Sequence, residues 1–133
     1  MATEYRILSA DDFVRLRESD NPEEYHKAAY GHADDAVWVE VLARFPEMTK
    51  WVAHNKNVPI SILRILIHDE NTEVRSMVAS KRKLEGDMFD TLAKDPDAGV
   101  RQRLAYNAKI TPAALAKLKQ DADPIVREAA LER

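Results

Sequence analysis

The chain of 133 residues contains no cysteine, few glycines and no long apolar run. The lack of cysteine excludes disulfide bonds and thiolate metal sites, and it is typical of proteins from a reducing compartment. Only three glycines are present, which argues against a sheet-rich fold with tight hairpins. No stretch approaches the roughly 20 apolar residues of a membrane span, and the first residues, MATEYRILSADD, lack the basic region and apolar core of a signal peptide. We therefore expect a cytoplasmic protein that does not enter a membrane and holds no cofactor.

The charges are unevenly distributed along the chain, whose net charge is −3. Residues 1–47 contain 11 acidic and 5 basic side chains, whereas residues 48–133 contain 12 acidic and 15 basic ones. Neither part is charged strongly enough to imply a nucleic-acid partner by itself. The content of 45% hydrophobic and 32% charged residues predicts a single soluble domain over residues 1–133.

The segment from Met48 to Arg133 repeats with a period of 26 residues. A fixed period of this length identifies a repeat architecture. Equivalent positions hold similar apolar residues: Met48, Val74, Val100 and Val126; Val52, Val78, Leu104 and Ala130; Leu63, Phe89 and Leu115; and Leu66, Leu92 and Leu118.

The spacing inside each repeat is helical, because the apolar residues stand three or four positions apart, as in Leu63 and Leu66 or Val74 and Val78. Residues at this spacing share one helix face, so each repeat holds two short amphipathic helices. Helices of about ten residues are marginal alone. Stability must come from stacking, in which each buried Leu or Val contributes roughly 1.5–3 kcal/mol. The predicted fold class is therefore all-α, an α-solenoid of 26-residue two-helix repeats.

The first part of the chain is less regular. Ser9-Ala10-Asp11-Asp12 approximates a capping box, and Asn21-Pro22 with the following acids marks a second helix start. That helix runs to about Tyr30, and Gly31 is a plausible stop. We predict an N-terminal helical cap over residues 1–34, a degenerate first repeat over 35–57 and regular repeats over 58–133. If two residues are missing before Met48, Val39 and Leu42 correspond to Leu63 and Leu66.

An aspartate precedes an arginine by six residues in three successive repeats, in the pairs Asp69 and Arg75, Asp95 and Arg101, and Asp121 and Arg127. We call these six residues the Asp–Arg ladder. An aspartate between two helices can accept N–H groups at the next helix start. The arginine can reach an aspartate of its own or of a neighbouring repeat. An acidic or guanidinium binding site is the functional alternative, but we predict that the ladder fixes the turn between the helices.

The pattern D-x-x-x-x-V-R-x-x-x-A, which begins at Asp69, resembles the second half of a HEAT repeat. The segments VAHN (52–55) and LAYN (104–107), each before a proline-bearing turn, resemble the leucine-rich repeat variant family. HEAT units are longer, at about 40–47 residues, which favours the variant family. The resemblance implies a right-handed, armadillo-like solenoid that alternates an α-helix with a shorter α- or 3₁₀-helix and serves as a binding scaffold. The best-known member type of the family carries an iron–sulfur cluster on cysteines beside its repeats, and this chain has no cysteine. Lys81 also departs from the asparagine of its column.

Catalytic and metal-binding signatures are not evident. The four histidines (His26, His32, His54 and His68) form no HExxH motif and no pair four residues apart. Neither a G-x-S-x-G nucleophile motif nor a glycine-rich phosphate loop is present. We therefore predict no metal and no catalytic residue.

The turn after each V/L-A-x-N/K segment is basic. If the repeats stack, these turns follow one edge and form a cationic strip, whose candidate binding residues are His54, Lys56, Lys81, Arg82, Lys83, Tyr106 and Lys109. Such a strip suits an acidic peptide or a phosphate backbone. The alternative is a set of solvated turns whose asparagines act only as turn caps.

Two apolar regions offer further contacts. Trp38, Phe45 and Trp51 fall near the junction with the cap, where they form either an aromatic pocket or cap packing. The edge of the last repeat is expected to be partly open and to allow homo-oligomers; its residues are Leu115, Leu118, Val126, Ala129 and Ala130.

Three functions are compatible with the sequence. The first is a non-enzymatic scaffold that binds a protein or peptide. The second is a nucleic-acid-binding repeat protein that uses the basic turns, and the third is a small enzyme of unrecognised type. Repeat architecture and the missing catalytic motifs favour the first, although a fold alone does not decide between them.

Overall fold

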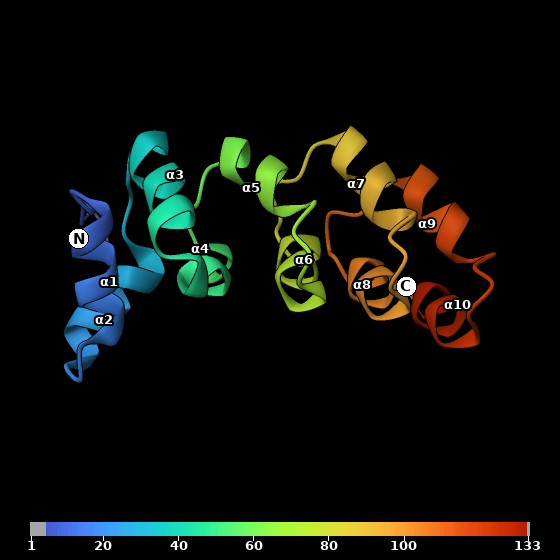
Figure 1. Ribbon diagram of the computed structural model, residues 1–133. Coiled ribbons are helices and arrows are strands. Elements are labelled where there is room, and N and C mark those ends of the chain that lie inside the picture. The colour runs from blue at the N-terminus through green and yellow to red at the C-terminus, as the bar shows by residue number, and fades with distance from the viewer. Residues whose placement is uncertain (1–4, 133) are drawn as a thin grey trace. The chain divides into compact units, whose positions relative to one another are not determined.

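The computed structural model describes residues 5–132, and over this range the chain forms ten α-helices, one short 3₁₀-helix and no strand (Figure 1). A single parallel bridge pairs Arg6 with His32. The prediction of an all-α fold is therefore confirmed for the described residues. Within the same range, no helix is long and apolar enough to cross a membrane.

Internal contacts divide the chain into two compact units that meet between Leu63 and Arg64. We call residues 5–63 the N-terminal unit and residues 64–132 the C-terminal unit. The helices of the N-terminal unit are α1 (Ala10–Glu18), α2 (Pro22–Tyr30), α3 (Asp35–Arg44), the 3₁₀-helix η1 (Pro46–Met48) and α4 (Thr49–His54). Helix α5 (Ile60–Leu66) crosses the boundary between the units.

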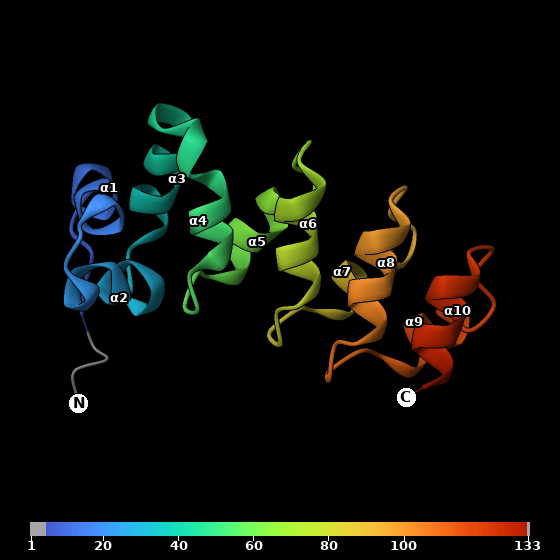
Figure 2. The same cartoon turned by 90° about the horizontal axis from the view of Figure 1, so that it is seen from below.

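The C-terminal unit continues with α6 (Thr72–Ala79), α7 (Gly86–Ala93), α8 (Ala98–Ala105), α9 (Pro112–Leu118) and α10 (Pro124–Leu131). Helices α6, α8 and α10 pack side by side in one layer, and α7 and α9 form the other. The row of α6, α8 and α10 is also seen in the turned view of Figure 2. Both helices of each pair in this unit are α-helical, so the shorter helix is not of the 3₁₀ type.

Helix starts follow local sequence signals. Ser9 caps α1, since its Oγ accepts a hydrogen bond from the Asp12 N–H at 3.0 Å. Asn21 and Asn71 cap α2 and α6, and each accepts the N–H of the glutamate two residues later, at 2.9 and 2.7 Å. Pro112 and Pro124 occupy the first turns of α9 and α10, where a missing N–H costs little. The starts of α6 and α10 follow the turns that hold the ladder residues Asp69 and Asp121.

The core of the N-terminal unit is aromatic. The rings of Phe13 and Trp38 are fully buried and meet edge to face, with centroids 5.2 Å apart and planes at 75°. Trp38 and Val41 are buried on α3, whereas Val39 is 47% exposed. The predicted alignment of Val39 and Leu42 with Leu63 and Leu66 is therefore wrong by one residue. The large indole of Trp38 takes the inward position.

Gly31 ends α2 with its N–H bonded to the Lys27 carbonyl oxygen at 2.7 Å. A Cβ at this position would lie 2.5 Å from that same oxygen and 2.9 Å from the buried Ile7 side chain. Glycine is thus required by the close approach of two segments rather than by a left-handed backbone, since its φ is −68°.

The core of the C-terminal unit repeats by position. The buried residues Val74 and Val78 on α6 correspond to Val100 and Leu104 on α8, 26 positions later. On the last pair, Leu118, Val126, Ala129 and Ala130 are also buried, so the predicted open edge is wrong for these four residues. The exposed apolar side chains there are instead Ile125 and Leu131.

Candidate functional site

Two of the ladder arginines, Arg75 and Arg101, each join two successive turns of the C-terminal unit. Arg75 donates from Nε and Nη2 to the two carboxylate oxygens of Asp95, at 2.7 and 3.2 Å. Arg101 holds Asp121 in the same way, at 2.9 and 3.2 Å. In Arg75 the remaining nitrogen, Nη1, donates to the backbone oxygen of Asp69 at 2.7 Å. In Arg101 the same nitrogen donates to the backbone oxygen of Asp95 at 2.6 Å. Each guanidinium is therefore bonded on three nitrogens.

The aspartates also shape their own turns. Asp69, Asp95 and Asp121 each accept the backbone N–H two residues later, at 3.0, 2.9 and 2.9 Å. This N–H belongs to the N-cap of the next helix. The carboxylates thus fix the turn and, at Asp95 and Asp121, receive the arginine of the preceding pair.

Three side chains of the two Arg–Asp pairs have pKa values shifted by their contacts. The hydrogen bond that Arg75 donates to Asp95 raises the pKa of Arg75, and the one that Arg101 donates to Asp121 raises the pKa of Arg101, in each case against partial burial. Burial alone would raise the pKa of Asp121, but the bonds from Arg101 and from the Asp123 N–H outweigh it and hold this pKa below its usual range. These shifts keep Arg75, Arg101 and Asp121 ionised at neutral pH.

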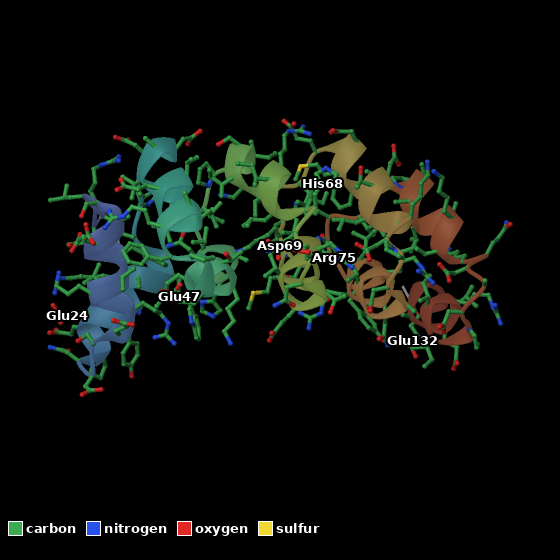
Figure 3. All side chains as sticks on the ribbon, viewed as in Figure 1. Glu24, Glu47, His68, Asp69, Arg75 and Glu132 are labelled. Atoms are coloured by element: carbon green, nitrogen blue, oxygen red, sulfur yellow. The ribbon has the colours of Figure 1, made fainter. Side chains whose placement is uncertain are left out.

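A surface groove of about 500 Å³ lies beside the first rung, the Arg75–Asp95 pair. The buried ion pair forms its floor, and the exposed side chains of His68, Asp90 and Lys94 stand at its rim. The full lining is Ile67, His68, Asp69, Arg75, Asp90, Thr91, Lys94, Asp95 and Pro96. Figure 3 labels His68, Asp69 and Arg75 around the turn between α5 and α6.

Two of the predicted basic turns come together in the C-terminal unit. The buried side chain of Asn107 donates from Nδ2 to the backbone oxygens of Ala79 and Lys81, both at 2.8 Å. Its Oδ1 accepts the N–H of Lys109 at 2.7 Å. Asn107 therefore fastens its own turn to the turn of the preceding pair, a role beyond the turn cap that the sequence predicts.

The side chains on these two turns point largely to solvent. Arg82, Lys83, Tyr106 and Lys109 are exposed and Lys81 is half-buried. Partial desolvation lowers the pKa of Lys83. The hydroxyl of Tyr106 donates to Glu132 at 3.5 Å, so this ring is turned toward α10.

The remaining predicted residues, His54 and Lys56, belong to the N-terminal unit. The ring of His54 meets Trp51 edge-on, with centroids 5.6 Å apart. Arg17 places its guanidinium carbon 3.5 Å above the Trp51 ring. These residues line a small pocket of about 110 Å³ together with Tyr25, Ala28 and Ala29. Trp51 thus packs in a different contact from the Phe13–Trp38 pair.

Sequence reasoning missed the groove beside the ladder. A signal was present, because His68 and Lys94 occupy one column of the repeat, directly before the ladder aspartates Asp69 and Asp95. The column places polar side chains beside the paired turns. Among residues 5–132, no three His, Asp or Glu side chains gather closely enough to hold a metal ion.

Comparisons of the chain with protein-family models, with curated proteins and with solved structures find no match. The resemblance to leucine-rich repeat variant and HEAT units therefore stays a prediction from the sequence.

Proposed function

We propose that the chain is a non-enzymatic, cytoplasmic scaffold of the leucine-rich repeat variant or HEAT-like kind that binds a protein or peptide. Its architecture in this proposal is a right-handed α-solenoid of 26-residue repeats behind an N-terminal helical cap. The support is positional: Arg75 and Arg101 make equivalent contacts 26 residues apart. Units of this kind stack into surfaces suited to recognition.

The observation that carries the proposal is the groove of about 500 Å³ beside the Arg75–Asp95 pair. This volume falls within the range of about 300–1,000 Å³ typical of ligand sites. Its floor is fixed, since the guanidinium of Arg75 is bonded on three nitrogens. Its rim offers a carboxylate from Asp90 and an ammonium from Lys94. Exposed groups of both signs suit an extended peptide, whose backbone supplies both donors and acceptors.

The test is crosslinked capture from native lysate with three forms of the full chain. The double variant Asp90→Lys/Lys94→Glu inverts the rim without changing net charge. The control Lys117→Glu/Glu128→Lys does the same with two exposed residues outside the groove lining. We expect a partner that the wild type and the control capture and the rim variant loses. Capture that is equal for all three forms would contradict binding in the groove.

A second candidate is nucleic-acid binding, which the junction at Asn107 favours because it gathers Arg82, Lys83 and Lys109 on neighbouring turns. Binding of this kind depends steeply on salt, since each neutralised phosphate releases counterions. The variant Arg82→Glu/Lys83→Glu should abolish retention on single-stranded RNA or DNA at low salt and leave capture by the groove unchanged. Retention that is insensitive to both salt and charge reversal would exclude this candidate.

A further inference from the structure

The small pocket beside Trp51 contains an arginine without an acidic partner. Arg17, on the last turn of α1, places its guanidinium carbon 3.5 Å above the Trp51 ring. Among residues 5–132, no carboxylate pairs with this guanidinium, and its buried Nε–H has no hydrogen-bond acceptor. Buried polar groups normally have a partner, so an exception of this kind calls for an explanation.

The neighbouring Arg15 on the same helix shows the opposite arrangement. It is exposed and pairs with two carboxylates, that of Asp12 at 2.9 Å and that of Glu24 at 2.8 Å. A charge that is withdrawn from water has the greater need of a counterion, because desolvation penalises the charged form. Asp12 and Glu24 thus neutralise the exposed arginine, whereas the half-buried Arg17 is left without a counterion.

Three helices hold the pocket in shape. Its lining comprises Arg17 from α1, Tyr25, Ala28 and Ala29 from α2, and Trp51 and His54 from α4. The turn after α4 is fastened to α2 by the Lys56 N–H, which donates to the Ala29 oxygen at 2.7 Å. Nδ2 of Asn55 adds a bond to the Ala28 oxygen at 2.8 Å. The walls therefore need little rearrangement to accept a ligand.

The size and chemistry of the pocket limit what it can hold. Its volume of about 110 Å³ lies below the range of about 300–1,000 Å³ typical of sites for cofactors and drug-sized ligands. It therefore accommodates a single small group. Arg17 is the only arginine or lysine among the described residues that line it, and one guanidinium balances one negative charge. A carboxylate matches this better than a phosphate, which carries more charge and a third acceptor oxygen.

We propose that this pocket binds the carboxylate of a short aliphatic acid group, which is either a free small acid or a glutamate side chain of a peptide. The carboxylate pairs with Arg17, because a guanidinium placed over a ring keeps the N–H groups of its edge for hydrogen bonds. The aliphatic stem lies against the Trp51 ring and the Ala29 methyl group. The site belongs to the N-terminal unit and does not depend on the groove beside Arg75.

The test follows two indole signals by NMR while sodium butyrate is titrated into the isotope-labelled full chain. Trp38 and Trp51 are the two tryptophans, and Trp38 is fully buried outside the pocket lining, so its Nε1–H serves as an internal control. We expect a saturable shift of the Trp51 signal alone and no response to butyramide, which has a similar shape without the charge. A Trp51 signal that butyrate does not move, or that butyramide moves equally, overturns the proposal.

Three variants locate the contact. Arg17→Gln should raise the dissociation constant of butyrate at least tenfold, because it removes a charge-assisted hydrogen bond. Arg103→Gln removes the same charge from an exposed position outside the lining and should leave the constant unchanged. Ala29→Leu fills the pocket with Arg17 in place, so it should also weaken binding and tests the site if Arg17→Gln does not fold. Unaltered affinity in Ala29→Leu, or in folded Arg17→Gln, overturns the proposal.

The same titration separates the two sources of the carboxylate. An acetylated and amidated Gly-Gly-Glu-Gly-Gly peptide should bind at least tenfold more tightly than butyrate if a glutamate side chain is the ligand, and its glutamine counterpart should not bind. Butyrate that binds as tightly as the peptide assigns the pocket to a free acid. Inorganic phosphate that binds more tightly than both probes overturns the assignment to a carboxylate.

Discussion

The two units of the chain hold their helices together by different means. In the C-terminal unit, buried Arg–Asp pairs connect successive turns, with side chains only 12% and 5% exposed in the Arg75–Asp95 pair. In the N-terminal unit, the ion pairs lie at the surface and an edge-to-face pair of Phe13 and Trp38 fills the core. The same kind of helical pair is thus stabilised by polar connections in one unit and by aromatic packing in the other.

The comparison separates two roles of the ladder aspartates. In the turn before α2, Ser19 stands two residues ahead of the N-cap Asn21, where the C-terminal unit has aspartate. The hydroxyl of Ser19 still accepts the Asn21 N–H at 3.0 Å, so the turn keeps its shape. Tyr25 replaces the arginine four residues after the cap. Turn shaping therefore needs only an acceptor, whereas joining two pairs needs the charge.

Loss of the aromatic core should have the largest effect. Trp38→Ala removes a fully buried indole and should lower the free energy of unfolding by about 3–5 kcal/mol. Trp38→Phe should cost less, because it keeps a ring and removes an Nε1–H that has no hydrogen-bond partner among the described residues. Hydrogen exchange should show lost protection in α1 and α3 with α8 still protected. Equal loss in both units would mean that they unfold as one.

Loss of one Arg–Asp pair of the ladder should have the next largest effect on stability. Arg101→Gln leaves the half-buried Asp121 carboxylate without its partner and should cost about 2–4 kcal/mol. Arg64→Gln is the matched control, since Arg64 also contacts two carboxylates, Glu85 and Asp87, but at the surface. That change should cost no more than about 1 kcal/mol. Urea unfolding of both variants measures the difference, and similar losses would refute the distinction between the rungs and the surface pairs.

Both units contain a buried asparagine that donates hydrogen bonds to two backbone oxygens, and its contribution to stability can be compared between them. Asn55 donates to the backbone oxygens of Ala28 and Gly31, as Asn107 does to those of Ala79 and Lys81. Asn55→Ala and Asn107→Ala should each cost about 1–3 kcal/mol, because two buried carbonyl groups lose their donor. Thermal unfolding of the two variants provides the measurement. A much smaller effect at Asn55 would show that the connection matters only where the ladder accompanies it.

Acid should produce the smallest effect, which Asp121 isolates in the C-terminal unit. The folded pKa of Asp121 lies below its unfolded value, so its contribution to stability is complete above the unfolded pKa, about 3.9. It is lost as the pH falls through the folded pKa. Wild type should therefore lose more stability than Asp121→Asn between pH 5 and the acid limit of folding, as measured by urea titration at each pH. Parallel curves would indicate that Asp121 is not involved.

The sequence predicts best what depends on neighbouring residues. Ser9 and Asn21 cap their helices as their motifs indicate, because a cap involves only the next two or three residues. The alignment of Val39 with Leu63 was wrong by one residue, since the inward position depends on the volume left by Phe13 on another helix. Periodicity identifies a helix face but not its exact rotation.

The candidate site was predicted less well. The basic turns were found from their charges, and the structure shows that Asn107 joins two of them. The groove beside Arg75 and Asp95 was not predicted, because it exists only when the arginine of one helical pair reaches the aspartate of the next helical pair. The sequence left open whether each arginine pairs within its own repeat or with its neighbour.

The two sets of hydrogen bonds made by Arg75, and likewise by Arg101, differ in the number of residues between the donor and the acceptor. Nη1 reaches a carbonyl six residues back, whereas Nε and Nη2 reach a carboxylate 20 residues ahead. A nascent polypeptide emerging from the ribosome can thus set each arginine as soon as its own helix forms, and engage the next aspartate when that turn appears. Translation and assembly can then advance in the same direction, with each newly made helical pair captured by the one before it.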